Sequence, residues 1–339
     1  MNGETIQLGH GNGGRMMAGL ISDLFRRHFA NPFLNPLDDG ALLPELEPGQ
    51  RLSFSTDSFV VDPLFFPGGC IGELAVNGTV NDLCMCGSQP RWLSAGFIIE
   101  EGLPLEDLDR IAAAMAEAAA RVGVQIVTGD TKVVEKGKAD KLFINTSGIG
   151  VIAHGLTLGS RHLQPGDRLI ISGTLGDHGI AILSRRQNLG FSTALLSDTA
   201  PLHELTALLL SECGEAVHAL RDPTRGGLAA TCHEFARGSS LEIRLEEKAL
   251  PVRPDVAAAC GLLGLDPLYI ANEGKLVAAI AGEAAESAVA ALRSHPLSRD
   301  AAVIGEVKKG EAGLVALHTS LGAWRLVDLP AGELLPRIC

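Results

Sequence analysis

The sequence predicts an α/β (α+β) fold divided into two domains. The chain has 339 residues, which is long for one compact domain and suits two domains of about 150 residues each. Segments with the apolar spacing of strands alternate along the chain with segments that have the spacing of helices. Between residues 154 and 167, glycines and a Pro-Gly turn interrupt this alternation. We therefore expect the domain boundary near residue 155.

The first half begins with a glycine loop that feeds a helix. Glycines are frequent between residues 9 and 14, and apolar residues then recur at helical spacing from Met16 to Phe29. Further helices are predicted at 71–86 and 105–122, and strands at 51–61, 124–128 and 142–153. The strand at 124–128 should end where Gly129-Asp130-Thr131-Lys132 begins.

The second half repeats this alternation. A strand at 168–173 leads through a glycine-rich turn, Gly173–Gly179, into a helix. Helices are also predicted near 203–219, 226–237 and 284–293, and strands near 241–245, 275–281 and 302–308. The last twelve residues contain two prolines and a glycine, which disfavours a helix and predicts an extended, mobile end. The predicted domains are 1–155 and 156–327, followed by a tail at 328–339.

Composition excludes several classes of protein. The formal net charge is -12 and the 28 basic residues are scattered, so we expect no nucleic-acid partner. No apolar stretch approaches the ~20 residues that span a bilayer, and the first residues lack the pattern of a signal peptide, which predicts a cytoplasmic protein without a membrane partner. Seven cysteines in such a chain indicate reduced thiols rather than a disulfide framework.

A glycine loop and several acidic residues together suggest a nucleotide site. The loop His10-Gly11-Asn12-Gly13-Gly14 precedes a helix, so its backbone N–H groups and the helix dipole could hold phosphate. An ordinary glycine turn is the alternative, because the loop lacks the standard phosphate-binding patterns. The acids stand in predicted loops or at element ends, without a basic residue at an obvious pairing position: Asp39, Asp57, Asp82 and Asp130. Converging carboxylates would bind Mg²⁺, whereas separate ones would be solvated or cap helices.

Nine segments carry a more specific resemblance. They are HGNGG, STDSFVVDPLFFPGG, IGELAVNGTVNDL, EEGLP, TGDTKVV, SGTLGDHG, RDPTRGGLAA, ANEGKLV and PRIC. In this order, from His10 to Cys339, they resemble the HypE family of hydrogenase maturation factors. That family belongs to a superfamily of ATP-binding enzymes with aminoimidazole ribonucleotide synthetase, selenophosphate synthetase and thiamine monophosphate kinase. The glycine loop and GDT are similar to the whole superfamily, while the terminal PRIC is much narrower.

The resemblance implies a fold and a reaction. The fold is the two-domain PurM-like ATP-binding fold, with mixed β-sheets and flanking helices, a homodimer through the N-terminal domain, and ATP with Mg²⁺ between the halves. The carbamoyltransferase HypF places a carbamoyl group on the terminal thiol. The enzyme then uses ATP to dehydrate this group to a thiocyanate, and the cyanide passes to iron on a HypC–HypD scaffold for [NiFe]-hydrogenase.

The resemblance also implies residue roles, position by position. Cys339 is the carbamoyl acceptor, and Glu273 and Lys132 are candidates for proton transfer and for stabilising charge on the thiocarbamate oxygen. The implied Mg²⁺ ligands are Asp57, Asp82 and Asp130, with Asp39 as a fourth. The implied nucleotide contacts are His10, Gly11, Gly13, Gly14 and Asn81.

Structural alternatives stand beside these roles. Glu273 could pair with Lys275, and Lys132 could merely balance Asp130 at the surface. The thiol of Cys339 could be a dangling group, although a terminal residue on an extended leader has the reach to enter a distant site. His178 and His233 could be polar core residues or phosphate contacts. Asp222 and Arg225 could be a helix cap and a surface pair before the helix at 226–237.

Two rival functions remain at the level of sequence. A selenophosphate synthetase would need a reactive cysteine beside the N-terminal glycine loop, but the first cysteine is Cys70. A non-catalytic thiol carrier would have no use for the acids around the phosphate loop.

Overall fold

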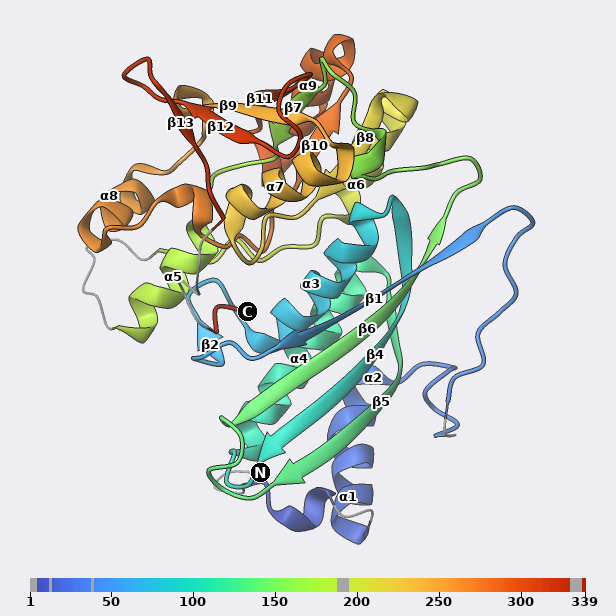
Figure 1. The fold of residues 1–339 in the computed structure, drawn as a ribbon. Helices are drawn as coiled ribbons and strands as arrows, with labels where there is room; N and C mark the ends of the chain where they lie inside the picture. The colour runs from blue at the N-terminus through green and yellow to red at the C-terminus, as the bar shows by residue number, and fades with distance from the viewer. Residues whose placement is uncertain (1–4, 12–13, 38–39, 188–194, 330–336) are drawn as a thin grey trace.

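The strands form two main sheets, one in each half of the chain (Figure 1). The computed structural model describes residues 5–11, 14–37, 40–187, 195–329 and 337–339. The first sheet has four strands and the second has seven, and a short ribbon forms a third sheet. The predicted boundary at residue 155 falls between the last strand of the first sheet, which ends at Ile152, and the first strand of the second, which begins at Arg168.

The first half is a mixed sheet with helices on one face. Its strand order is β1-β6-β4-β5, in which only the β4–β5 pair is parallel. The strands are β1 (Arg51–Phe59), β4 (Ser88–Glu100), β5 (Gln125–Val134) and β6 (Leu142–Ile152), with β2 (Phe65–Phe66) and β3 (Gly69–Cys70) forming the ribbon. The helices are α1 (Arg15–Leu20), α2 (Arg26–Phe29), α3 (Ile71–Met85) and α4 (Leu105–Val122). A π-helical turn, Ile21–Phe25, joins α1 to α2.

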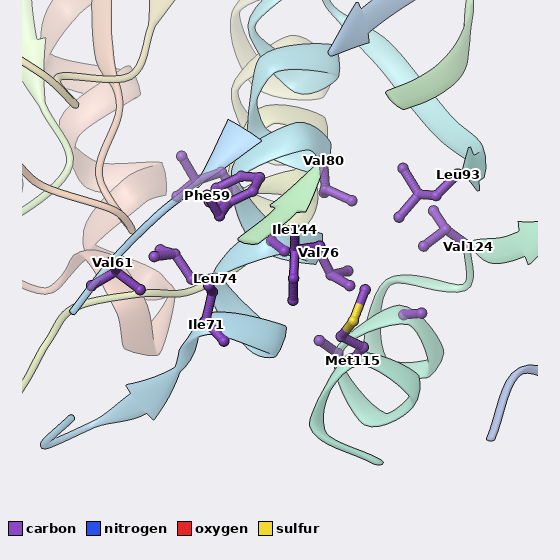
Figure 2. Packing of buried hydrophobic residues seen from close by; sticks show 14 of the residues in the cluster. Phe59, Val61, Ile71, Leu74, Val76, Val80, Leu93, Met115, Val124 and Ile144 are labelled. Carbon is purple, nitrogen blue, oxygen red and sulfur yellow. The ribbon is translucent and has the colours of Figure 1, made fainter. Parts of the chain in front are cut away.

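Helix α3 lies at the centre of the molecule. It contacts the first sheet, α4 and also α6 of the second half, so apolar residues surround it and nearly every position is buried. Figure 2 shows Val76 and Val80 of this helix beside Ile144 of β6, with Met115 of α4 nearby. The same apolar cluster continues into the second half through Leu202. The two halves therefore share one core.

The second half is built around a larger mixed sheet. Its strand order is β13-β12-β9-β11-β7-β10-β8, with β12 and β9 parallel and the other pairs antiparallel. The strands are β7 (Arg168–Ile171), β8 (Val217–Arg221), β9 (Glu242–Glu246), β10 (Val277–Ile280), β11 (Ala302–Lys308), β12 (Val315–His318) and β13 (Trp324–Leu326). The helices are α5 (Asp177–Arg186), α6 (His203–Cys213), α7 (Gly227–Ser239), α8 (Pro254–Leu263) and α9 (Ala285–Ser294). None of the helices in the described ranges has the length and apolarity to cross a membrane.

Two expectations about element boundaries are wrong. The strand expected to end before Gly129 continues through it as β5, where Gly129 lies against the carbonyl of Ala95 and any Cβ would clash with that oxygen. The helix expected over 203–219 ends at Cys213, and Val217 begins strand β8. Strand β4 and helix α8 were not predicted at all.

Candidate active site

The end of the chain lies between the two halves. Figure 1 shows the C-terminus beside β2 and α5. The side chain of Ile338 is only 4% exposed and belongs to the shared apolar cluster. The backbone N–H of Val60, just after β1, donates to a main-chain carboxylate oxygen of Cys339 at 3.1 Å. Cys339 is partly buried in this position, so its thiol lies inside the molecule.

Acidic residues surround this thiol. Burial raises the pKa of Cys339 above its usual value, and the negative charges of Glu273, Asp57 and Asp222 act in the same direction. Arg225 opposes them. The docked thiol is therefore protonated at neutral pH and is a poor nucleophile in this position.

Glu273 has a buried carboxyl group with an unpaired oxygen. Its residue is 3% exposed, and its Oε1 has no hydrogen-bond partner among the described residues. The backbone of Glu273 is fixed, because its N–H donates to Asp198 Oδ1 at 3.1 Å and its carbonyl accepts from Asn81 Nδ2 at 3.3 Å. Burial, followed by the charge of Asp222, raises the pKa of Glu273 well above its usual value.

The alternative pairing of Glu273 with Lys275 is wrong. Lys275 Nζ lies 2.9 Å from Asp198 Oδ2 and 3.9 Å from Asp177 Oδ2. The Lys275 ammonium therefore pairs with two other acids, and among the described residues Glu273 Oε1 has no hydrogen-bond partner.

Asp57 and Asp82 form a second acidic group beside the first. Asp57 lies on β1 and Asp82 on α3, so both stand within elements rather than in loops or at their ends. Ser55 Oγ donates to Asp82 Oδ2 at 2.6 Å. Burial raises the pKa of Asp57 and of Asp82, and the charge of Asp57 adds to the rise at Asp82.

These two carboxylates fit a magnesium ion. Mg²⁺ is commonly held by one or two carboxylates together with substrate phosphates and water, and the mutual repulsion of two half-buried acids favours a cation between them. In the described ranges, no three His, Cys, Asp or Glu side chains are close enough to enclose a metal by themselves. The pair Asp57 and Asp82 therefore suits an ion that phosphate oxygens complete.

Asp130 and Lys132 lie apart from that group within one chain. Both stand on β5, and two strands separate β5 from the strand that carries Asp57. Lys132 Nζ approaches Asp130 to 3.0 Å, and both side chains are 62% exposed. The hydrogen bond from Lys132 lowers the pKa of Asp130. The expectation that these acids lack a basic partner is thus wrong for Asp130.

The predicted nucleotide contacts have varied environments. His10 and Gly11 form a short 3-10 turn, where Gly11 lies against the backbone of Val133 on β5. Gly14 is the N-terminal cap of α1. Gly13 and Asp39 lie outside the described residues.

The side-chain amide of Asn81 forms hydrogen bonds that join the two halves. Its Nδ2 donates to the carbonyls of Ala200 and Glu273, and its Oδ1 accepts from the N–H of Leu202 at 2.8 Å. This arrangement favours a role in positioning Glu273.

Sequence reasoning did not assign Asp222 to the site. The cap of α7 is Gly226, so Asp222 does not cap that helix. Burial and the neighbouring Asp82 raise the pKa of Asp222 to about 7. The loop is tied to the site because the side-chain amide of Asn272, next to Glu273, donates to the carbonyl of Pro223 at 2.9 Å. The signal in the sequence was the RDPTRGG segment, whose acid was interpreted as a cap.

Comparisons with known proteins agree along the whole chain. The models of the N-terminal and C-terminal domains of the AIR synthase related proteins match residues 37–152 and 164–317. A relative from Bradyrhizobium diazoefficiens, named carbamoyl dehydratase HypE, is 55% identical over 98% of this chain and 96% of its own length.

Two solved structures extend the comparison. A hydrogenase maturation protein HypE in complex with ATP has a TM-score of 0.94 and 51% identity, covering 99% of this chain and 100% of that one. A chain of a HypE–HypF complex has a TM-score of 0.80 and 48% identity, covering 92% and 99% of the two chains.

Proposed function

The chain belongs to the HypE family of carbamoyl dehydratases, which act in hydrogenase maturation, and on this basis we propose that its substrate is a carbamoyl group on its own Cys339. The observation that carries the proposal is the position of the terminal thiol, inside the molecule and within the electrostatic reach of Glu273, Asp57 and Asp222. A passive thiol carrier would not need a buried carboxyl group with an unpaired oxygen at this place.

The reaction requires both an activated oxygen and a proton acceptor. Dehydration of S–C(=O)–NH₂ breaks the carbon–oxygen bond, removes both N–H protons and leaves S–C≡N, while ATP and the departing oxygen become ADP and phosphate. Glu273 Oε1 is suited to move one of these protons, because none of the residues that the structure describes forms a hydrogen bond with this atom. Its raised pKa makes the carboxylate of Glu273 a stronger base than an exposed one.

We assign ATP and Mg²⁺ to the region of Asp57 and Asp82. The support is the ATP in the related HypE structure and the fit of the two carboxylates to a phosphate-bound cation. Mg²⁺ would supply positive charge that neutralises phosphate oxygens and lowers the pKa of nearby carboxyl groups. Within the chain, Arg225 lowers the pKa of both Asp57 and Asp82, and Arg221 also lowers that of Asp82.

A homodimer is the state in which Lys132 and Asp130 would reach a nucleotide site. Both are exposed on the face of the first sheet that α3 and α4 leave uncovered. The same face carries exposed apolar side chains, with Phe54 69%, Leu52 56% and Ile98 45% exposed. A monomer rarely leaves such a patch in water, and a second copy of the chain would cover it.

The partners follow the order of the reaction. The related chain in complex with HypF supports HypF as the donor of the carbamoyl group, and a HypC–HypD iron scaffold is the proposed acceptor of the cyanide. The seven cysteines are all unpaired, which supports the reducing cytoplasm as the location.

Intact-mass spectrometry tests the acceptor directly. The purified chain is incubated with the carbamoyltransferase, its carbamoyl donor and ATP. We expect the C-terminal peptide to gain a carbamoyl group and then to lose one water, and only with ATP. Cys339→Ala should gain nothing, whereas Cys213→Ala, which changes a partly buried cysteine elsewhere, should behave as wild type. A modification that persists in Cys339→Ala would refute the proposal.

A further inference from the structure

The end of the chain is held through the side chains of Arg337 and Ile338 and through its backbone: Arg337 Nε donates to the carbonyl of Val60 at 3.0 Å, and Ile338 is buried. The main-chain oxygens of three consecutive residues, two carbonyls and the terminal carboxylate, each accept a hydrogen bond from a different donor. The pairs are Arg186 Nη2 to Arg337 O (2.5 Å), His178 Nε2 to Ile338 O (2.9 Å) and Val60 N to Cys339 O (3.1 Å). Two of these donors, His178 and Arg186, are side chains of α5.

His178 is fixed as a hydrogen-bond donor to the tail. A carbonyl oxygen can only accept, so the proton is on Nε2. Ser197 Oγ lies 2.8 Å from Nδ1 and itself accepts from the N–H of Thr199 at 3.1 Å, which leaves the hydroxyl proton for Nδ1. His178 is fully buried, and burial lowers its pKa. The ring is therefore neutral, with its donating side directed at Ile338.

Arg186 connects the tail to the first half of the chain. Its Nε and Nη2 donate to the carbonyl of Asp62 at 2.9 and 2.7 Å, and Nη2 also donates to the carbonyl of Arg337. The ring of His178 meets that of Phe66 on β2 edge-on, with centroids 5.7 Å apart. Helix α5 thus holds the last residues of the tail against the loop that follows β1.

We propose that His178 and Arg186 are positioning residues that dock the tail and hold Cys339 beside Glu273 during dehydration. This proposal rests on the proposed function, since it takes Cys339 as the carrier of the substrate. Because both side chains contact carbonyl oxygens that any residue would present, they fix the position of the terminal residue without contacting the group on its sulfur. They should therefore act on docking and leave the transfer from the carbamoyltransferase unaffected.

Alkylation of Cys339 by iodoacetamide measures docking without any catalysis. The reagent attacks the thiolate, which the docked position disfavours, so the rate follows the undocked fraction. With the full chain and the mass of the C-terminal peptide as readout, His178→Leu and Arg186→Gln should each raise the rate about fivefold, the factor for one typical hydrogen bond. A single turnover of carbamoylated chain should slow in both variants, and His178→Asn, which keeps a donor, should recover part of the loss.

Two matched variants control for general damage. His218→Gln removes a partly buried histidine of the same half, which lies 2.7 Å from Asp167, and Arg185→Gln removes the neighbouring, exposed arginine of α5. Both should keep the wild-type alkylation rate and unfolding temperature.

The outcomes separate this proposal from the one before it. Unchanged alkylation in His178→Leu and Arg186→Gln, with normal unfolding temperatures, overturns the docking role. If His178→Leu does not fold, Arg186→Gln decides alone, because glutamine keeps the first part of the aliphatic side chain and loses the hydrogen bonds of the guanidinium to Asp62 and Arg337. Failure of wild type to accept a carbamoyl group on Cys339 would instead refute the proposed function, while alkylation would still report on docking.

Discussion

At the scale of single residues, the site concentrates negative charge at low exposure. Asp57, Asp82, Asp222 and Glu273 each have a raised pKa, and in every case burial is the largest cause. Such groups are held in the folded chain at an energetic cost. This composition supports the proposal that the site binds a cation and transfers protons.

The pH dependence of stability tests Asp222. Its folded pKa of about 7 lies above the ordinary value of 3.8, so its contribution is fully present below about pH 4 and is lost as pH rises through about 7. Asp222→Asn removes this titration and should flatten the fall in unfolding free energy between about pH 4 and pH 7, by about 2–4 kcal/mol.

Urea unfolding at several pH values, without nucleotide or metal, measures this difference. Asp328→Asn, at an exposed position, is the control and should keep the wild-type slope. Parallel curves for wild type and Asp222→Asn would show that the carboxyl group does not titrate near neutrality.

At the scale of elements, the outer face of the first sheet carries apolar side chains that no other element of the described chain covers. Successive side chains of a strand point to opposite faces, so Leu52 and Phe54, two residues apart on β1, lie on the same outer face. Ile98 of β4 is also exposed there. On the opposite face, helices cover the same strands.

Phe54→Glu should split the expected dimer. A charge at the centre of a buried apolar interface would cost several kcal/mol, about enough to shift a micromolar dimer to monomer. Light scattering after size exclusion measures the mass. Leu262→Glu, at an equally exposed site on α8 (79% exposed), should leave the mass unchanged, and a monomeric wild type would contradict the prediction.

Elements with strong local signals were predicted from the sequence. Helix α4 matches the prediction at both ends, because its apolar spacing is clear and Gly123 at its end adopts the left-handed conformation that stops a helix. The strand predicted at 124–128 ends too early, because a glycine such as Gly129 is typical of a turn. Its real role, a close approach to the carbonyl of Ala95, depends on a neighbouring strand that no local pattern reveals.

At the scale of the whole molecule, Asn81 links the two halves. Asn81→Ala would leave the N–H of Leu202 and the carbonyls of Ala200 and Glu273 buried without this partner, at a cost of about 3 kcal/mol. Thermal unfolding should show this loss. Asn145→Ala, which removes an exposed asparagine of β6 that hydrogen-bonds β1, should cost much less. Equal stability of the two variants would contradict the linking role.

The same scale explains which site residues the sequence could not reveal. Asp222 and His178 stand far apart in the chain, and each has an ordinary structural interpretation by itself. Only the packing of the second half against α3 brings Asp222 near Cys339 and places His178 against the carbonyl of Ile338. The PRIC motif at the chain end, in contrast, is one continuous segment, so its resemblance to the family is visible in the sequence itself.

The hydrogen bonds to the main chain of residues 337–339 have a consequence for how the end of the chain binds and is released. A covalently attached ligand meets its receptor at an effective concentration of about millimolar, so an intrinsic affinity that would be useless for a free peptide suffices here. The hydrogen bonds to the main chain of residues 337–339, the apolar side chain of Ile338 and the partly exposed ion pair of Arg337 with Asp140 together are of that order. The covalent link thus lets the end of the chain stay bound most of the time and still leave readily, as the proposed transfer of a carbamoyl group onto Cys339 by another protein would require.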